Sequence, residues 1–347
     1  MTEYETITSD LEQLCGACGV AGHPAAAQAA AELLRPLTDE CRTDTIGNVL
    51  AVRRSTRADA PVILLEAHLD EIGFLVTDID DLGFVHVAAA GGIDTRVLAA
   101  QPVQVHGDAL YSGVFCSVPP HLIREDSALP ALENMGIDIG MTAEQAREHV
   151  PLGSRVGFAP CFCRLNEHTV SSKALDDRAG CAAILHCLRQ LKETAATVVV
   201  SFSAQEEIGS RGAGLAARQL RPCVALATDV SFALAPEEKP HECGKLGGGV
   251  MIGISPVLDT AVSARLQQLA AQKAIPAQTE VMGGRTGTDA DMISNEGCGI
   301  PTGLLSIPQR YMHTPVEIVD IRDIAATGDL MAAYVQNCVE EVRKYHG

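Results

Sequence analysis

Residues 61–70 read PVILLEAHLD, and the rest of the chain is interpreted outward from this stretch. Its first six residues form a short apolar run with β-branched side chains, which predicts a buried strand over 61–66. Polar chemistry begins abruptly where this strand ends, at His68 and Asp70. Because sites in open α/β sheets form outside the carboxyl ends of strands, we expect this end to carry function.

The sequence downstream of Asp70 has a different texture. Residues 72 to 163 contain short strand-like segments, tight turns and little helix, and Asp80-Asp81-Leu82 is a hairpin signal. We therefore expect a mostly β insert over residues 70–163, such as a small barrel. Its expected elements are strands over 72–79, 83–87, 102–106 and 109–118 and a helix over 142–149.

Helices and apolar strands alternate again after Leu165. This alternation predicts an α/β fold, in which a mixed or parallel sheet is flanked by helices on both faces. The main domain would comprise residues 1–69 and 164–347. Its expected elements are helices over 24–35, 177–192, 212–220, 259–274 and 321–344, and strands over 197–203, 223–228 and 302–307.

Composition excludes several classes of function. The 26 Lys and Arg residues face 44 Asp and Glu residues, giving a net charge of −18, which argues against a nucleic-acid partner because phosphate binding needs a basic face. No apolar run reaches the roughly 20 residues of a membrane span. Residues 1–10 lack the basic and apolar regions of a signal peptide. We therefore expect a cytoplasmic protein with no membrane partner.

The twelve cysteines are scattered along the chain. Cys15 and Cys18 form a lone CxxC, and Cys161 and Cys163 form a lone CxC. Neither has a second pair at the spacing of a zinc site, so their spacing does not predict structural zinc. Reduced thiols in apolar stretches behave as small hydrophobic groups, and we expect most of these cysteines to do so.

Acidic and histidine residues gather at five places next to predicted strands or helices. Adjacent carboxylates repel one another, and a lone buried carboxylate is costly, but a divalent cation removes both problems. Asp, Glu and neutral His together suit Zn²⁺, Co²⁺ or Mn²⁺ better than Ca²⁺, which prefers oxygen ligands. The five places are His68 with Asp70, Asp176 with Asp177, Glu206 with Glu207, Asp229, and His313.

Each of these places also has an ordinary explanation. A histidine after a strand is commonly a hydrogen-bonded structural residue, and Asp176-Asp177 before a helix is commonly an N-cap. Glu206-Glu207 before Ile208-Gly209 is commonly a solvated turn. The occurrence of all five in the order His-x-Asp, Asp-Asp, Glu-Glu, Asp, His is far more specific than any one of them.

That order resembles the family of di-metal aminopeptidases, which includes the tetrahedral aminopeptidases, glutamyl aminopeptidase and proteins once labelled endoglucanase or cellulase M. The resemblance covers nearly the whole chain. The stretches that carry it are EAHLDEIGF (66–74), ALDDRAG (174–180), SAQEEIGSRGA (203–213), ATDVS (227–231), LGGGVMIGISP (246–256), GTDA (287–290) and IPTGLLSIPQRYMHTPVE (300–317).

The resemblance implies a di-zinc exopeptidase-like fold that holds two divalent metal ions. The favoured ions for both positions are Zn²⁺ and Co²⁺. His68, Asp176 and Asp229 would hold one ion, and Asp176, Glu207 and His313 the other, with Asp176 bridging both. Glu206 would be the general base that moves the proton of the attacking water to the leaving amine. Asp70 would orient His68, and Asp177 would support the turn.

The resemblance also implies partners. The substrates would be short peptides with a free N-terminus, and the insert would be a dimerisation domain from which a dodecamer is built. The preferred N-terminal residue stays open, since Arg285 and Lys245 favour an acidic one only if they lie near the site. Similarly, residues 287–290 line the substrate side or cap a helix.

Three other functions are alternatives to a di-metal aminopeptidase. A di-zinc carboxypeptidase or N-acyl amino acid deacylase of the same wider clan would use a similar ligand order with a different insert. A non-catalytic metal-binding scaffold would not need both Glu206 and Glu207. A glycosidase would use two carboxylates flanking a sugar, and the absence of Trp leaves few sugar-stacking platforms.

Overall fold

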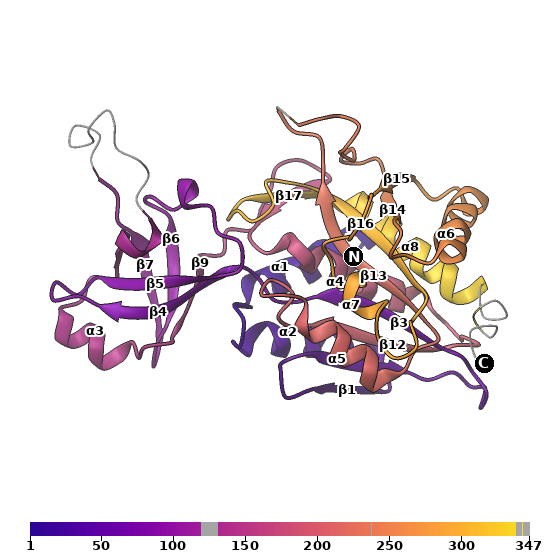
Figure 1. Cartoon of the computed structure of the whole chain (residues 1–347), viewed down its shortest axis with the longest axis horizontal. Helices are drawn as coiled ribbons and strands as arrows, with labels where there is room; N and C mark the ends of the chain where they lie inside the picture. The colour runs from indigo at the N-terminus through magenta and orange to yellow at the C-terminus, as the bar shows by residue number, and fades with distance from the viewer. Residues whose placement is uncertain (119–130, 237, 338–341, 343–347) are drawn as a thin grey trace.

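An eleven-stranded sheet forms the centre of the larger part of the molecule, and a closed barrel forms the smaller part (Figure 1). The computed structural model describes residues 1–118, 131–236, 238–337 and 342. The sheet runs in the order β1-β2-β12-β3-β13-β16-β17-β11-β10, and β14 pairs with β15 and β16. Its strands are β1 (Glu40–Thr43), β2 (Val49–Arg53), β3 (Val62–His68), β10 (Cys163–Arg164), β11 (Thr169–Ser172), β12 (Thr197–Ser203), β13 (Val224–Phe232), β14 (Val250–Ile254), β15 (Ala277–Val281), β16 (Thr302–Arg310) and β17 (Glu317–Asp320).

The strand predicted over residues 61–66 is β3, which lies among four parallel strands, β12-β3-β13-β16. Its side chains alternate between two cores: Ile63 and Leu65 pack with helices α4 and α8, and Leu64 packs on the opposite face with α5 and α7. Helices therefore cover both faces, as the apolar run predicted. The helices of this part are α1 (Glu3–Gly16), α2 (Ala25–Leu34), α4 (Leu175–Gln190), α5 (Arg211–Leu220), α6 (Thr260–Lys273), α7 (Ala290–Ile293) and α8 (Ile321–Asn337), with the 3-10 helix η1 (Arg35–Leu37).

The barrel closes in the order β4-β5-β8-β7-β6-β9 and has a core of its own. Three rings fill it: Phe74 lies edge-on to Phe115 and to Phe158, with centroid distances of 5.1 and 5.7 Å. The β-rich character expected of the insert is thus confirmed, while its boundaries at 70 and 163 and its role in dimerisation stay predictions. Its elements are β4 (Gly73–Ile79), β5 (Val85–Ala90), β6 (Pro102–His106), β7 (Leu110–Phe115), β8 (Ile137–Asp138), β9 (Arg155–Phe158), α3 (Ala143–His149), η2 (Thr95–Val97) and η4 (Leu132–Asn134).

Some elements differ from their predicted bounds. Strand β13 runs to Phe232, so Asp229 lies within it instead of after it. Helix α4 begins at Leu175, although Asp176 and Asp177 have non-helical backbone angles and a cis peptide bond joins them. Helix α8 is described to Asn337, and most of the remainder of its predicted span lies outside the described residues. None of the described helices is long and apolar enough to cross a membrane.

A buried ion-pair network lies where the barrel chain leaves β3. Glu71 accepts hydrogen bonds from Lys173 Nζ at 2.7 Å, from Arg178 Nη2 at 3.2 Å and from the backbone N–H of Gly19 at 2.7 Å. Arg178 is fully buried and also donates to the carbonyl of Ala17. Burial alone would raise the pKa of Glu71, but the two cations outweigh burial and lower it.

We expect Glu71→Ala to destabilise the protein by about 3–5 kcal/mol, because it leaves two buried cations without their counter-charge. A carboxyl with a lowered folded pKa stabilises above its unfolded pKa and loses that effect as the pH falls. The difference in the free energy of unfolding between wild type and variant should therefore become smaller in acid. Urea denaturation of both proteins at pH 7 and at pH 4 measures this difference. The exposed Glu32→Ala is the control, and an unchanged midpoint for Glu71→Ala would contradict the assigned role.

Candidate metal centre

Parallel register brings the predicted site residues to one edge of the sheet. His68, the last residue of β3, pairs with Ser203, the last residue of β12, and the Glu206-Glu207 turn follows three residues later. On the other side of β3, Glu66 pairs with Ala227 of β13, and His68 and Asp229 each lie two residues further along their strands. The edge is therefore the same one that the sequence predicted.

Asp176 lies at the centre of this group. His68 Nε2 is 2.9 Å from Asp176 Oδ1 and 3.8 Å from Asp229 Oδ1. On the other side, His313 Nε2 is 3.4 Å from both Asp176 Oδ2 and Glu207 Oε2. The five predicted metal ligands thus lie around the two oxygens of one carboxylate, with one histidine at each oxygen. Ligand atoms of His68, Asp176 and Glu207 come within 4.8 Å of one another.

Asp70 holds the Glu206-Glu207 turn. Its Oδ1 accepts from the backbone N–H of Glu206 at 3.0 Å, and its Oδ2 accepts from that of Glu207 at 3.2 Å. The sequence led us to expect an Asp70 carboxylate that orients His68. In the structure that carboxylate is 3.8 Å from His68 Nδ1, and the backbone carbonyl of Asp70 contacts the ring nitrogen at 3.2 Å instead.

Glu317 is a buried residue that the sequence analysis did not single out. It accepts hydrogen bonds from the backbone N–H of Asp176 at 3.1 Å and from that of His313 at 3.0 Å. One carboxylate therefore fixes the two segments that face each other across the centre. Glu317 is the last residue of the stretch 300–317, which carries part of the resemblance. This position was the signal by which the sequence could have identified it as a site residue.

Asp177 makes its hydrogen bond within its own helix. Its Oδ1 accepts from the backbone N–H of Gly180 at 2.9 Å, which matches the expected support of the turn. Of the GTDA stretch, Thr288 accepts from the N–H of Ala290, and Asp289 accepts from the Ser203 hydroxyl at 2.5 Å. Asp289 is the N-cap residue of α7, but its side chain makes no capping hydrogen bond, so both interpretations of that stretch stay predictions. Arg285 and Lys245 are exposed.

The electrostatics of the group favour bound cations. Burial raises the pKa of Glu207 to about 8 and that of Asp229 well above its ordinary value. The hydrogen bond to Asp176 raises the pKa of His313 to about 9. Without cations the group balances its charge by holding protons. A set of carboxylates and imidazoles that must take up protons in this way fits divalent cations, which would replace those protons.

Residues with positive φ flank the predicted ligands. Ala174 precedes Asp176, Gln205 and Ser210 bracket the Glu206-Glu207 turn, and His313 itself has a φ of 59°. A non-glycine residue in this region costs about 1–3 kcal/mol and persists only where the surroundings hold it. The strain is concentrated at the turns that aim these side chains.

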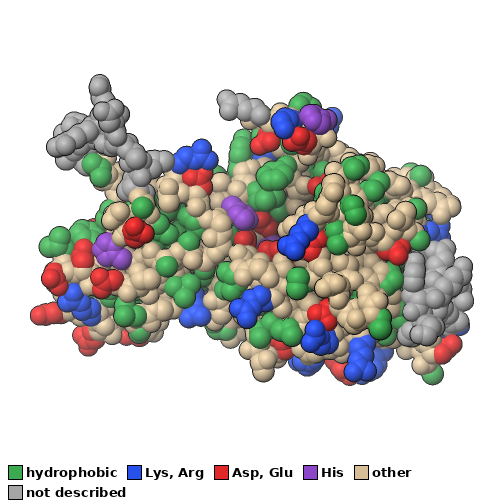
Figure 2. Space-filling model, in the orientation of Figure 1, with side chains coloured by type: hydrophobic (Ala, Val, Ile, Leu, Met, Phe, Trp, Pro, Cys, Tyr) green, Lys and Arg blue, Asp and Glu red, His purple; other side chains and the backbone are tan. Residues whose placement is uncertain are grey.

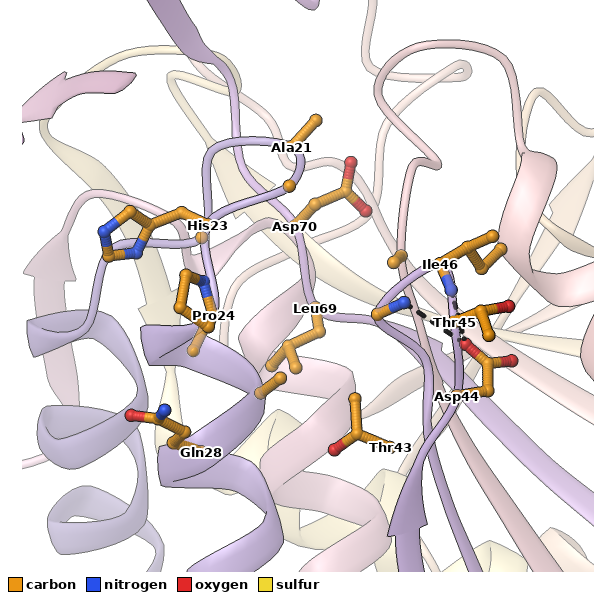
Figure 3. Close-up of a pocket in the computed structure, with 16 residues that line it drawn as sticks. Ala21, His23, Pro24, Gln28, Thr43, Asp44, Thr45, Ile46, Leu69 and Asp70 are labelled. Carbon is orange, nitrogen blue, oxygen red and sulfur yellow. Dashed lines mark hydrogen bonds between the residues drawn. The ribbon is translucent and has the colours of Figure 1, made fainter. Parts of the chain in front are cut away.

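Acidic and histidine side chains gather where the barrel meets the larger part (Figure 2). Beside this place lies a cavity of about 380 Å³, whose lining includes Leu69, Asp70 and the turn at Asp44–Ile46 (Figure 3). Asp70 is the one predicted site residue among those that line it. The cavity therefore adjoins the group of ligands without containing it.

Comparison with known proteins was made on the sequence and on the fold. A family described as M42 glutamyl aminopeptidase matches residues 47–330. A lysyl aminopeptidase of Pyrococcus furiosus is 34% identical over 88% of this chain and 89% of its own. An aminopeptidase of the archaeon Desulfurococcus kamchatkensis is similar in structure, with a TM-score of 0.92, 31% identity and coverage of 99% and 98%.

A third similar protein is the Pyrococcus horikoshii TET1 peptidase, described as able to assemble into a tetrahedron or a large octahedral shell. It has a TM-score of 0.83 and 30% identity, over 95% of this chain and 99% of its own. These similarities agree with the resemblance that the motifs predicted, and with the predicted mixed sheet and separate β-rich part.

We expect Asp70→Ala to loosen the Glu206-Glu207 turn. Each lost hydrogen bond to a charged group corresponds to about 1.5–3 kcal/mol, so exchange of the two amide protons should accelerate by roughly 10- to 100-fold. Hydrogen exchange read by mass spectrometry on a peptide spanning 204–210 measures it. The exposed Asp78→Ala in the barrel is the control. Unchanged exchange in Asp70→Ala would show that the turn holds itself.

Proposed function

Since the chain belongs to the M42 glutamyl aminopeptidase family, we propose that it removes N-terminal residues from short peptides with two divalent cations held at this centre. The cations are Zn²⁺ or Co²⁺, and Mn²⁺ is compatible with the same ligands. The observation that carries the proposal is the position of Asp176 between the two histidines, at 2.9 Å from His68 and 3.4 Å from His313.

This position supports the following ligand set. His68, Asp176 and Asp229 hold one cation, and Asp176, Glu207 and His313 hold the other. Asp176 suits the shared position because both of its oxygens face a histidine, and because His313 and His68 lower its pKa despite its burial, which keeps it ionised. Bound cations supply Lewis acidity, which polarises a peptide carbonyl and lowers the pKa of water.

Glu206 is the proton carrier in this proposal. Its Oε1 accepts a hydrogen bond from the Ser210 hydroxyl at 2.9 Å, which fixes the side chain without taking it into the ligand set. Burial raises the pKa of Glu206, although His68 opposes the rise, and a raised pKa makes a carboxylate a better base near neutral pH. Glu206 takes the proton of the attacking water and returns it to the leaving amine.

Asp70 and Glu317 position these groups in the proposed reaction. Asp70 sets the backbone of the base and of its neighbouring ligand, Glu207, while Glu317 sets the backbone of Asp176 and His313. Neither contact uses the atoms that would meet substrate or cation. The geometry of the centre is therefore held by carboxylates that bind backbone N–H groups behind it.

The barrel has a separate part in the proposal. We assign it to contacts between subunits, in a dodecamer built from dimers. Its surface exposes large apolar side chains, among them Leu82, Leu110 and Leu152, and exposed apolar groups of this kind favour association. Closed symmetric assemblies are the common outcome for soluble homo-oligomers.

Glu206→Gln should lower turnover by about 10²- to 10⁴-fold, which is the usual range for general-base catalysis, and leave the metal content unchanged. Hydrolysis of aminoacyl p-nitroanilides and elemental analysis measure the two quantities. The exposed Glu193→Gln is the matched control. Normal turnover in Glu206→Gln would remove Glu206 from the mechanism. Hydrolysis of N-acyl amino acids in place of p-nitroanilides would indicate the deacylase alternative.

Cation binding to the chelator-treated protein should release at least two protons at pH 7, because Glu207 and His313, with pKa values of about 8 and 9, must give up their protons to become ligands. The ligands His68 and Asp229, whose pKa values are also raised, would add to this number. Calorimetric titration of Zn²⁺ in two buffers of different ionisation enthalpy counts these protons.

EDTA should abolish activity, and Zn²⁺ or Co²⁺ should restore it. Asp176→Asn should lose metal as well as activity. Full activity after exhaustive chelation would exclude the metal mechanism.

The protein should be a large homo-oligomer in its metal-loaded form. Removal of the metal ions should loosen the segments that carry the metal ligands and should shift the oligomer towards dimers, because an ion that binds the assembled form stabilises that form. Light scattering on the metal-loaded and EDTA-treated protein measures both states. A metal-loaded monomer at micromolar concentration would refute the assembly and leave the assignment of the ligands untouched.

A further inference from the structure

A second group of metal-ligating side chains lies between the barrel and the larger part. Cys18 and His23 come from the segment that joins α1 to α2, and His106 is the last residue of β6. Their ligand atoms, one from each residue, all lie within 4.8 Å of one another. Cys18 is buried, and the two histidines are half-buried. None of the three takes part in the centre described above.

The polar atoms of this group are only partly satisfied by protein. His23 Nδ1 accepts a hydrogen bond from the backbone N–H of Ala25 at 3.3 Å, and the Cys18 thiol interacts with the backbone of Val20. The rings of His23 and His106 lie 4.3 Å apart between centroids, tilted by 56°. His106 Nε2 is buried and has no hydrogen-bond partner among the described residues. A buried polar atom without a partner costs about 1–3 kcal/mol, so a ligand at this nitrogen would remove a real penalty.

Both segments are held in place around the group. The N–H of His23 donates to the carbonyl of Val20 at 2.9 Å, and Arg155 Nε donates to the carbonyl of Ala21 at 3.2 Å. Arg155 of β9 pairs with His106 of β6 in the barrel ladder, so neighbouring barrel residues both meet the 18–24 segment. The donors therefore approach from two rigid parts of the protein, as a preorganised site requires.

The protonation states suit a cation. Burial lowers the pKa of His23, and burial together with His23 lowers the pKa of His106 to about 4, so both imidazoles are neutral at neutral pH. Burial raises the pKa of the Cys18 thiol to about 11. A cation that binds here must therefore displace the thiol proton, which leaves to solvent as the metal–sulfur bond forms.

We propose that Cys18, His23 and His106 bind a third metal ion, Zn²⁺, that ties the barrel to the larger part of the protein. One thiolate and two neutral imidazoles are ligands that Zn²⁺ prefers, and water completes its tetrahedral coordination. The site is structural, because a cation there crosslinks segments 83 residues apart in sequence between His23 and His106. It does not depend on the proposed peptidase mechanism.

Co²⁺ substitution isolates this site. The ligands assigned to the di-metal centre are carboxylates and imidazoles, so absorption from thiolate-to-Co²⁺ charge transfer reports a cysteine ligand, and its loss in Cys18→Ser assigns it to this site rather than to exposed thiols such as Cys161 and Cys163. The full-length protein is stripped with a chelator and titrated with Co²⁺. We expect this absorption to appear in the wild type and to disappear in Cys18→Ser, which should bind about one metal ion fewer per chain than the wild type. Cys41→Ser is the matched control and should behave as the wild type.

His106→Gln guards against a folding artefact, because this half-buried residue is at the end of a barrel strand. The variant should keep its circular dichroism spectrum, bind Co²⁺ at least 10-fold more weakly at the thiolate site, and keep aminopeptidase activity. Zn²⁺ should raise the melting temperature of the wild type more than that of either variant. No thiolate absorption at saturating Co²⁺, or the same absorption in Cys18→Ser, would overturn the proposal whatever the fate of the di-metal centre.

Discussion

Repulsion between carboxylates is the constraint on which the site depends. The parallel register of β3 and β13 brings His68 and Asp229 to one edge, and the loops beyond add Asp176, Glu206 and Glu207. These acids are buried or half-buried, so their negative charges cannot be left to solvent. Protons or cations must balance them. The positive-φ turns and the carboxylates behind the centre hold the acids together against that repulsion.

Much of this arrangement was predictable because its signals are local. An apolar run that stops at a His-x-Asp sequence identifies a strand and its functional end together. The alternation of Ile63, Leu64 and Leu65 between two cores follows from the period of a strand. The five acidic and histidine sites were identified in the same way, since each lies at or near the end of an element, while their roles as ligands rest on the resemblance and stay predictions.

The remainder depended on contacts that a sequence pattern does not contain. The carboxylate of Asp70 binds two backbone N–H groups of a turn 136 residues away, in addition to lying 3.8 Å from its near neighbour His68. Glu317 has a backbone role with no motif of its own. In sequence, Cys18 pairs only with Cys15. In the structure, the potential ligand atoms near Cys18 belong to His23 and to His106, which lies on a strand of the barrel. Spacing rules find sites within a segment and miss those formed between segments.

The stretch from His68 to Glu71 joins the site to the junction with the barrel. Within four residues it supplies a predicted ligand, the carboxylate that holds the Glu206-Glu207 turn, and the buried partner of Lys173 and Arg178. Arg178 follows Asp176 by two residues, so the same two segments are tied together both at the centre and at the junction. A shift of the barrel that pulls on Glu71 would therefore also move His68 relative to Asp176. The Cys18 group lies at the same junction, next to Gly19, whose N–H donates to Glu71, so the proposed cation would tie the barrel to this junction without contacting the centre.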